Sequence, residues 1–368
     1  MGGKAMKRIA VIASVILVLA LSGIFAISGQ REEGAESSGP VRVGMLMIGS
    51  RENSSWNEAH WEGIQAAAQK LNLVIDCREN LSEEDCSQVL DDLVNGGCRI
   101  IISTSIDFQD VIVQAAARHP SIYFFQATGT QTAPNLISYM GRMYQMRYLA
   151  GIVAGRQSQS GSVGYVTTEA IPEVIRGIDA FALGVRKVRP SARVYVQYTD
   201  TWSDDAVAQQ KTEELLAEHP DIDIIGMHID TYGPLQVAER QGIHAIGCNV
   251  DVRAAYASTF LTAPVWNWSI FYQEYVREAL NNKFEGGTYL VGADSGIVAL
   301  APLHFQHDVS LDGMLRTEQR RMAAGESDVF YGPIWDNHGV LQVADGENLS
   351  DKTLFQDLDW YVEGVVLP

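Results

Sequence analysis

The residues in this sequence that could do chemistry are aromatic rings and short polar side chains, and they stand directly after apolar, strand-like segments. In open sheets of parallel strands, ligands bind beyond the carboxyl ends of the strands. Aromatic faces can stack on a flat ring while Asn and Asp hydrogen-bond to its edge. We therefore predict a site for a planar, polar, uncharged ring, with the candidate residues Trp56, Asn57, His60, Thr104, Phe108, Trp202, Asp230, Asp251, Trp266 and Asn267.

Some of these residues also have a purely structural interpretation. His60 lies one helical turn after Trp56 and shares its face, but a lone histidine is more often structural than a ligand contact. Asp230 and Asp251 follow predicted strands, where they could either bind a ligand or serve the fold. Asp204 precedes a predicted helix, and a negative charge there is favourable to the helix itself.

Sequence motifs typical of catalysis are absent. The chain holds no G-x-x-x-x-G-K-[ST], no G-x-G-x-x-G, no G-x-S-x-G and no H-E-x-x-H. Its eight histidines show no spacing of metal ligands. We therefore expect a protein that is not an enzyme and uses no metal ion and no cofactor. Missing motifs do not exclude an enzyme, and a nucleoside hydrolase is the enzyme alternative.

Length and charge restrict the classes of protein that the chain can belong to. With 368 residues it is about twice as long as a typical domain, so two lobes are expected. Lys and Arg total 27 against 45 Asp and Glu, a net charge of −18. This field repels the phosphates of nucleic acids, so we expect no nucleic-acid partner.

The N-terminal segment is typical of export. Lys4, Lys7 and Arg8 precede residues 9–27, which carry no charge, and Ala26-Ile27-Ser28 fits a cleavage site. We predict a signal peptide over 1–28, a linker over 29–40 and a periplasmic or extracellular protein. An uncleaved anchor at 9–27 is the alternative, since 19 apolar residues nearly span a bilayer. No Cys stands at the end of the signal to carry a lipid.

Four cysteines, Cys77, Cys86, Cys98 and Cys248, follow this leader. Disulfides form in exported proteins, and the spacings match no zinc site. Cys77 ends a predicted strand and Cys86 begins the next predicted helix, so they are the most plausible disulfide pair. Buried free thiols are the alternative, and the pairing stays open.

Strands and helices alternate along the chain in two successive runs. The first run begins with a strand at 41–48 and a helix at 55–71, and the second begins with a strand at 162–167 and a helix at 172–188. The polar segment 157–161 lies between them. Alternation of this kind predicts βαβ units with parallel strands, so we predict an α/β fold with two doubly wound lobes.

The last third of the chain is predicted to pass back to the first lobe and then return to the second. On this interpretation lobe I comprises 41–158 and 253–288, and lobe II comprises 159–252 and 289–368. Several crossings between two lobes make a hinge, and hinged lobes enclose a small ligand.

Four segments resemble a known family. They are Tyr139–Gly155 (YMGRMYQMRYLAGIVAG), Ile171–Phe181 (IPEVIRGIDAF), Thr199–Asp204 (TDTWSD) and Ala299–Pro302 (ALAP). Together they are similar to the basic membrane protein family, the substrate-binding proteins of ABC importers. The resemblance covers about residues 41–366 and is strongest to the adenine- and purine-binding branch.

This resemblance implies a type I periplasmic-binding fold and a monomer that delivers its ligand to an ABC permease. It implies two aromatic residues that clamp a purine, matched by Trp56 and Trp202, with Phe108, Asp230 and Asp251 at further family positions. A Lys common in nucleoside binders is replaced by Asp294. Loss of that cation favours a nucleobase over a nucleoside. A nucleoside-binding importer component, an extracellular sensor domain and a sugar binder are the alternatives.

Overall fold

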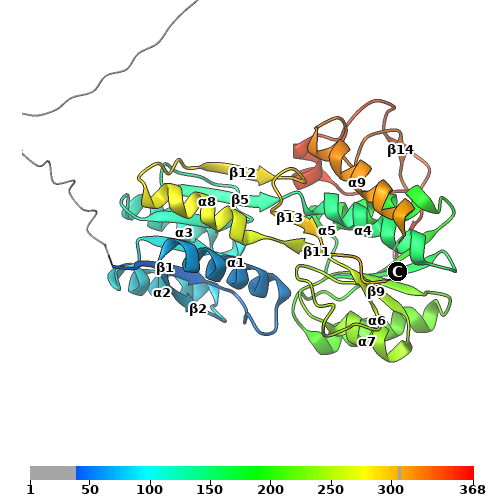
Figure 1. Ribbon diagram of the computed structural model, residues 1–368, viewed down its shortest axis with the longest axis horizontal. Coiled ribbons are helices and arrows are strands. Elements are labelled where there is room, and N and C mark those ends of the chain that lie inside the picture. The colour runs from blue at the N-terminus through cyan, green and yellow to red at the C-terminus, as the bar shows by residue number, and fades with distance from the viewer. Residues whose placement is uncertain (1–38, 306–307) are drawn as a thin grey trace, which may run out of the picture. The chain divides into compact units, whose positions relative to one another are not determined.

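Two six-stranded parallel sheets organise the residues that this computed structural model describes, 39–305 and 308–368 (Figure 1). The predicted signal peptide lies outside the described residues. From Pro40 onward the chain forms one unit. The prediction of an α/β fold with two parallel-sheet lobes is confirmed.

The first lobe is built on the sheet with strand order β12-β5-β4-β3-β1-β2, all of whose strand pairs are parallel. Helices α1 and α8 pack against each other beside it, while α2 and α3 pack on its strands. The strands are β1 (Val41–Leu46), β2 (Leu73–Arg78), β3 (Ile100–Ser103), β4 (Tyr123–Ala127), β5 (Leu136–Gly141) and β12 (Gly287–Val291). The helices are α1 (Ser55–Leu71), α2 (Glu83–Asn95), the 3₁₀ turn η1 (Ile106–Phe108), α3 (Gln109–Arg118) and α8 (Trp268–Leu280).

The second lobe is built on the sheet with strand order β10-β9-β8-β6-β7-β16, whose pairs are also parallel. Its strands are β6 (Ser162–Thr167), β7 (Arg193–Tyr198), β8 (Ile224–His228), β9 (His244–Ile246), β10 (Phe260–Thr262) and β16 (Val365–Val366). Its helices are α4 (Met143–Gln157), α5 (Pro172–Val188), α6 (Asp205–Glu218), α7 (Gly233–Gln241) and α9 (Val309–Ala323). The remaining elements are the antiparallel pairs β11 (Pro264–Trp266) with β13 (Val298–Leu300) and β14 (Ile334–Trp335) with β15 (Leu341–Val343), and the π-helical turn η2 (Thr353–Asp357).

Helix α1 shows how the sequence defines the elements that carry the site. The Ser54 side chain accepts a hydrogen bond from the Asn57 backbone N–H and so caps the helix. At the other end Asn72 takes a left-handed conformation with φ 52°, which terminates the helix. These two signals give the bounds Ser55–Leu71 that the apolar spacing predicts.

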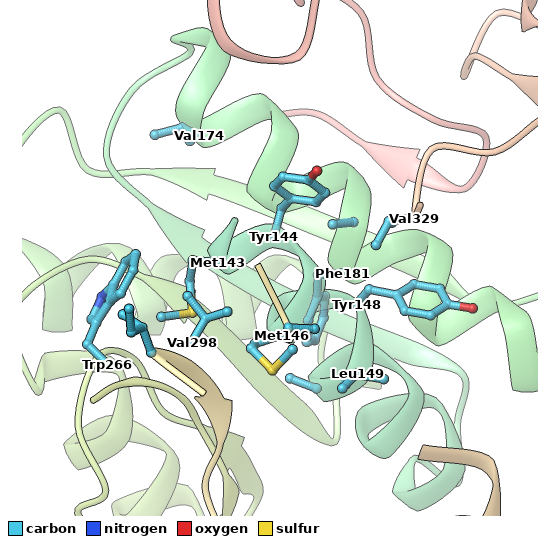
Figure 2. Packing of buried hydrophobic residues seen from close by; sticks show 14 of the residues in the cluster. Met143, Tyr144, Met146, Tyr148, Leu149, Val174, Phe181, Trp266, Val298 and Val329 are labelled. Atoms are coloured by element: carbon cyan, nitrogen blue, oxygen red, sulfur yellow. The ribbon is translucent and has the colours of Figure 1, made fainter. Parts of the chain in front are cut away.

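Helix α4 follows strand β5, and its neighbours bury it almost completely. It packs closely on α5, because a Cβ on Gly151 would lie 2.1 Å from the Phe181 carbonyl oxygen and one on Gly184 would lie 2.0 Å from that of Tyr148. Figure 2 shows Tyr144, Met146 and Tyr148 of α4 among the buried side chains of this region.

Two strands depart from the sequence-based expectations. The sequence predicts a connector at Tyr289–Gly292, but β12 pairs with β5 and forms an edge of the first sheet. Strand β5 itself is not among the predicted strands. Strand β10 lies at the edge of the second sheet. The lobe boundaries at residues 158, 253 and 289 remain predictions, although α4 packs on α5, β10 joins the second sheet and β12 joins the first sheet.

The predicted disulfide between Cys77 and Cys86 is not formed. All four cysteines are free thiols. Cys86 is buried in the core beneath α2, and burial raises the pKa of the Cys77 thiol to about 11. Among the described residues no helix combines the length and the hydropathy of a membrane span.

Candidate functional site

A cavity of about 500 Å³ lies between side chains of both lobes. Its first wall follows the carboxyl ends of β1 and β3 and includes Trp56, Asn57 and Thr104. Its second wall follows β7 and β8 and includes Trp202 and Asp230. The cavity therefore lies where the strand-end rule for parallel sheets expects a ligand, and its volume suits a small organic molecule.

The first wall rests on a packed group of aromatic rings. Trp266 stacks on Trp268 with centroids 4.5 Å apart, and Trp268 stacks on His60 at 4.7 Å. Trp56 meets this stack edge-on, 4.4 Å from His60 and 5.5 Å from Trp266. The Trp56 indole N–H also donates to the Thr104 carbonyl at 2.8 Å. These contacts hold the Trp56 ring in one orientation beside the cavity.

Asn57 and Thr104 form the polar part of the same wall. Both are buried, and the Thr104 hydroxyl lies 3.1 Å from Asn57 Oδ1. That contact uses the carbonyl side of the amide. No described residue accepts a hydrogen bond from Asn57 Nδ2. Its two N–H donors are therefore available to an acceptor in the cavity.

The second wall carries Trp202, which packs edge-on against His228 with centroids 5.5 Å apart. The loop that bears it is held by the Asp230 backbone N–H, which donates to the Trp202 carbonyl at 2.9 Å. Both indoles are half-buried, and both line the cavity. A flat ring between the walls could contact an indole from each lobe.

Asp230 contributes a carboxyl group to the cavity wall. Its Oδ1 accepts a hydrogen bond from Asn249 Nδ2 at 3.0 Å. Burial raises the pKa of Asp230 to about 7, and the Asn249 hydrogen bond opposes part of that rise. Near pH 7 this side chain can therefore either donate to a ring acceptor or accept from a ring N–H.

Two arginines in the cavity wall were missed by the sequence analysis. Arg147 of α4 and Arg176 of α5 are both buried and both line the cavity. Neither follows a strand, so the strand-end rule does not select them. The available signal was their position inside Tyr139–Gly155 and Ile171–Phe181, the two most specific segments of the family resemblance.

Hydrogen bonds join the two walls beside the cavity. The Ser55 backbone N–H donates to the Asp230 carbonyl at 2.8 Å, and Asn249 Nδ2 donates to Ser55 Oγ at 3.0 Å. The Tyr232 hydroxyl donates to the Glu58 carboxylate. All three bonds attach the first turn of α1 to the second lobe.

His60 and Phe108 lie outside the cavity, although the sequence places both among the candidates. His60 is fully buried behind Trp56, where Nδ1 lies 2.6 Å from the Tyr272 hydroxyl, and burial lowers its pKa to about 3. Phe108 is fully buried in the core that underlies α2 and α3. Phe108 follows the strand-end pattern and His60 shares the helical face of Trp56, but both side chains turn into the lobe interior.

Three polar candidates are also not brought to the cavity. Asp251 is exposed and pairs with Arg253 at 2.9 Å. Asn267 is exposed and donates to the Gly296 carbonyl at 2.9 Å. Asp294 is exposed on a loop after β12, so its charge has no direct bearing on a ligand in this cavity. Each side chain is solvated or satisfied by its own loop.

No cluster of three or more metal-ligating side chains is present among residues 39–305 and 308–368. The cavity lining offers indole faces, amide groups, carboxyl groups, an imidazole and two guanidinium groups. These groups can stack on, and hydrogen-bond to, a small planar molecule.

Comparison with known sequences finds relatives along nearly the whole chain. A purine-binding protein of Brucella abortus is 29% identical over 354 residues, which are 95% of this chain and 98% of the relative. A Haloferax volcanii protein, provisionally named an ABC transporter glucose-binding protein, is 28% identical over 88% of this chain and 80% of the relative. Basic membrane protein B of Borreliella burgdorferi is 22% identical over 77% of this chain and 88% of the relative.

Solved structures share the fold. An ABC transporter solute-binding protein from Conexibacter woesei aligns with a TM-score of 0.68 at 19% identity, covering 78% of this chain and 97% of that one. One from Aeropyrum pernix aligns with a TM-score of 0.68 at 16% identity, covering 86% and 95%. The predicted type I periplasmic-binding fold is confirmed. Residues 40–322 match the family model described as ABC transporter substrate-binding protein PnrA-like. The chain therefore belongs to this family, the Bmp family of ABC transporter substrate-binding proteins.

Proposed function

We propose that this protein captures a purine nucleobase, or a related heterocycle, between its lobes and delivers it unaltered to a membrane permease. One observation carries the proposal: Trp56 and Trp202 come from opposite lobes and line the same cavity. An indole on each side suits a flat ring, and each aromatic pair contributes about 0.5–1.5 kcal/mol beyond the burial of area.

The polar groups of the cavity suit the edge of such a ring. Asn57 Nδ2 supplies donors, and Asp230 can donate or accept near pH 7. In a closed, water-excluding site these hydrogen bonds are stronger than in water. Opening the lobes would require breaking the bonds from Ser55 and Tyr232, so ligand contacts on both walls favour the closed form.

The relatives support a purine more than a sugar, but they name both. The purine-binding protein of Brucella abortus matches over 95% of the chain, which supports a purine. The name of the Haloferax volcanii relative raises glucose as the competitor, and sugars also stack on tryptophan. The buried aromatic group under Trp56 favours the fully planar ligand of the two.

A thermal-shift screen of purines, pyrimidines, nucleosides and sugars tests the proposal, followed by calorimetry on the compounds that stabilise the chain. We expect purine bases to raise the melting temperature and hexoses to leave it unchanged. Stabilisation by glucose but by no purine would overturn the proposal. A ribonucleoside that binds more tightly than its base would replace the nucleobase with a nucleoside. Chromatography of the ligand after incubation checks that it leaves unaltered.

Export and the monomeric state belong to the same proposal. We propose cleavage after the predicted signal peptide and release outside the cytoplasm, which mass spectrometry of the exported N-terminus tests. An intact 9–27 segment would instead favour the sensor alternative. Size-exclusion chromatography with light scattering should give the mass of one chain.

A further inference from the structure

Two buried arginines in the cavity wall, Arg147 and Arg176, have no carboxylate partner among the described residues. Arg147 and Arg176 are 4% and 5% exposed, yet neither has a carboxylate within 4 Å among the described residues. Arg147 donates to the Met227 carbonyl at 3.3 Å and to the Tyr165 hydroxyl at 3.4 Å and lies near the sulfur of Cys248. Arg176 donates to the Leu354 carbonyl at 2.6 Å and lies 4.0 Å from the centroid of the Phe355 ring. Buried charges in proteins are normally paired with an opposite charge, so two cations without a carboxylate partner beside a cavity point to a partner that enters it.

His228 is a second, independent sign of an unfilled polar site. Its Nδ1 atom is buried and has no hydrogen-bond partner among the described residues. Gly177 lets the α5 backbone approach this nitrogen closely, because a Cβ there would lie 2.9 Å from it and 3.2 Å from Arg147 Cδ. Burial and the two arginines lower the pKa of His228 well below its ordinary value, so the ring is neutral and one of its nitrogens can donate.

The acidic residues of the cavity offset the charge of this region only in part, and burial raises the pKa of Asp230 to about 7, which reduces its negative charge. Asp107 and Glu169 are exposed, and Glu173 is half-buried. Water screens such carboxylates much more than it screens the buried guanidinium groups. The deep part of the cavity near Arg147, Arg176 and His228, which we call the cationic end, therefore favours negative charge.

We propose that the cationic end receives the carbonyl-bearing, acidic edge of an oxopurine, such as xanthine or urate, in preference to the amino edge of adenine. The inference rests on the proposed function and specifies its ligand. Guanidinium groups donate well to carbonyl oxygens such as O6 of an oxopurine, and they also attract the anionic form of such a ring. The exocyclic amino group of adenine presents N–H donors at the same position, which would face the donors of Arg147 or Arg176 without forming a bond.

The experiment measures the affinity of the full chain for adenine, hypoxanthine, xanthine and urate by calorimetry, in mild detergent because residues 9–27 are apolar. We expect xanthine or urate to bind at least tenfold more tightly than adenine. Arg176→Met keeps the length of the side chain and removes its charge, so it should lower the ratio of oxopurine to adenine affinity at least tenfold.

Two further variants keep the outcome decisive. Arg156→Met removes the same charge from the opposite end of α4, where Arg156 pairs with Asp308 at 3.0 Å, and should leave the affinity ratio unchanged. Glu173→Gln removes a competing carboxylate and should raise the ratio. If Arg176→Met fails to fold, the affinity ratio of Glu173→Gln alone tests the preference for oxopurines.

Tighter binding of adenine than of any oxopurine would overturn this inference and leave the proposed function standing. An unchanged ratio in both Arg176→Met and Glu173→Gln would also overturn it. Binding of no purine at all would overturn the proposed function and this inference together.

Discussion

The two walls of the cavity differ in the kind of side chain that they present. On the first wall, Trp56 is hydrogen-bonded to Thr104 and packed against three other rings. On the second wall, Arg147 and Arg176 donate to carbonyls but have no carboxylate partner, and His228 Nδ1 has no hydrogen-bond partner among the described residues. The first wall therefore presents fixed aromatic faces, and the second presents cationic and polar groups.

This difference separates two tasks that a binding protein must perform. A rigid aromatic surface offers contact area at little cost in ordering, so it supplies affinity for flat molecules in general. Unpaired buried groups discriminate, because a ligand that cannot satisfy them leaves their desolvation uncompensated. We expect the first wall to determine whether a ring binds and the second wall to determine which ring binds.

The largest expected effect comes from the two tryptophans. Trp56→Ala should lower purine affinity at least tenfold and the free energy of unfolding by about 3 kcal/mol, because it also removes support from the ring group. Trp202→Ala should lower affinity similarly but stability by only about 1 kcal/mol. Calorimetry and urea denaturation measure both, with exposed Trp335→Ala as the control. Equal destabilisation by Trp56→Ala and Trp202→Ala would remove the contrast between the walls.

The pH dependence of folding stability tests whether Asp230 is buried in the second wall. The folded protein holds this proton up to about pH 7, whereas an unfolded aspartate loses it near its ordinary value of 3.8. The fold therefore loses stability at this site as pH rises between those values, and the loss is complete above pH 7. Asp230→Asn should gain stability relative to the original chain over that range, by on the order of 2 kcal/mol at pH 7.

Thermal denaturation of both chains from pH 4 to pH 8 measures this difference directly. The buried histidines His60 and His228 are present in both chains. The stability that each chain loses at low pH through their lowered pKa values therefore cancels in the comparison. Exposed Asp251→Asn is the matched control and should show no such gain. A stability difference that does not change with pH would contradict burial as the cause of a raised pKa at Asp230.

The smallest expected effect concerns the bond that joins the walls. Tyr232→Phe removes the hydroxyl that donates to Glu58 and should weaken the closed form by about 1 kcal/mol, or about fivefold in ligand affinity. Small-angle scattering should then show a larger radius of gyration for the ligand-free chain. Tyr331→Phe, which alters an exposed ring, serves as the control. Unchanged affinity and radius would show that the bond does not contribute to closure.

Sequence patterns predicted the elements of the first lobe better than the direction of individual side chains. The capping residues and apolar period of α1 define both of its ends, and the rule for strand ends selects Trp56, Thr104, Trp202 and Asp230, which all line the cavity. The same rule also selects Phe108, because position along the chain does not reveal whether a side chain turns towards the cavity or the core.

Arg147 could not be predicted as a cavity residue for a different physical reason. It lies in the second turn of α4, a helix buried on nearly every side, so no polar face distinguishes it from residues of the core. Strand β12 was missed because its partner β5 lies about 150 residues earlier in the chain, a pairing that local patterns do not encode.

The glycine contacts between α4 and α5 have a consequence for how selectivity is maintained. Gly151 and Gly184 let the two backbones touch, and Arg147 and Arg176 project from the same helix pair. Motion between the lobes would carry both guanidinium groups as one rigid piece, so their spacing is established during folding and does not have to be rebuilt at each encounter. A single methyl group added at either glycine would disturb that spacing without touching any atom of the cavity wall.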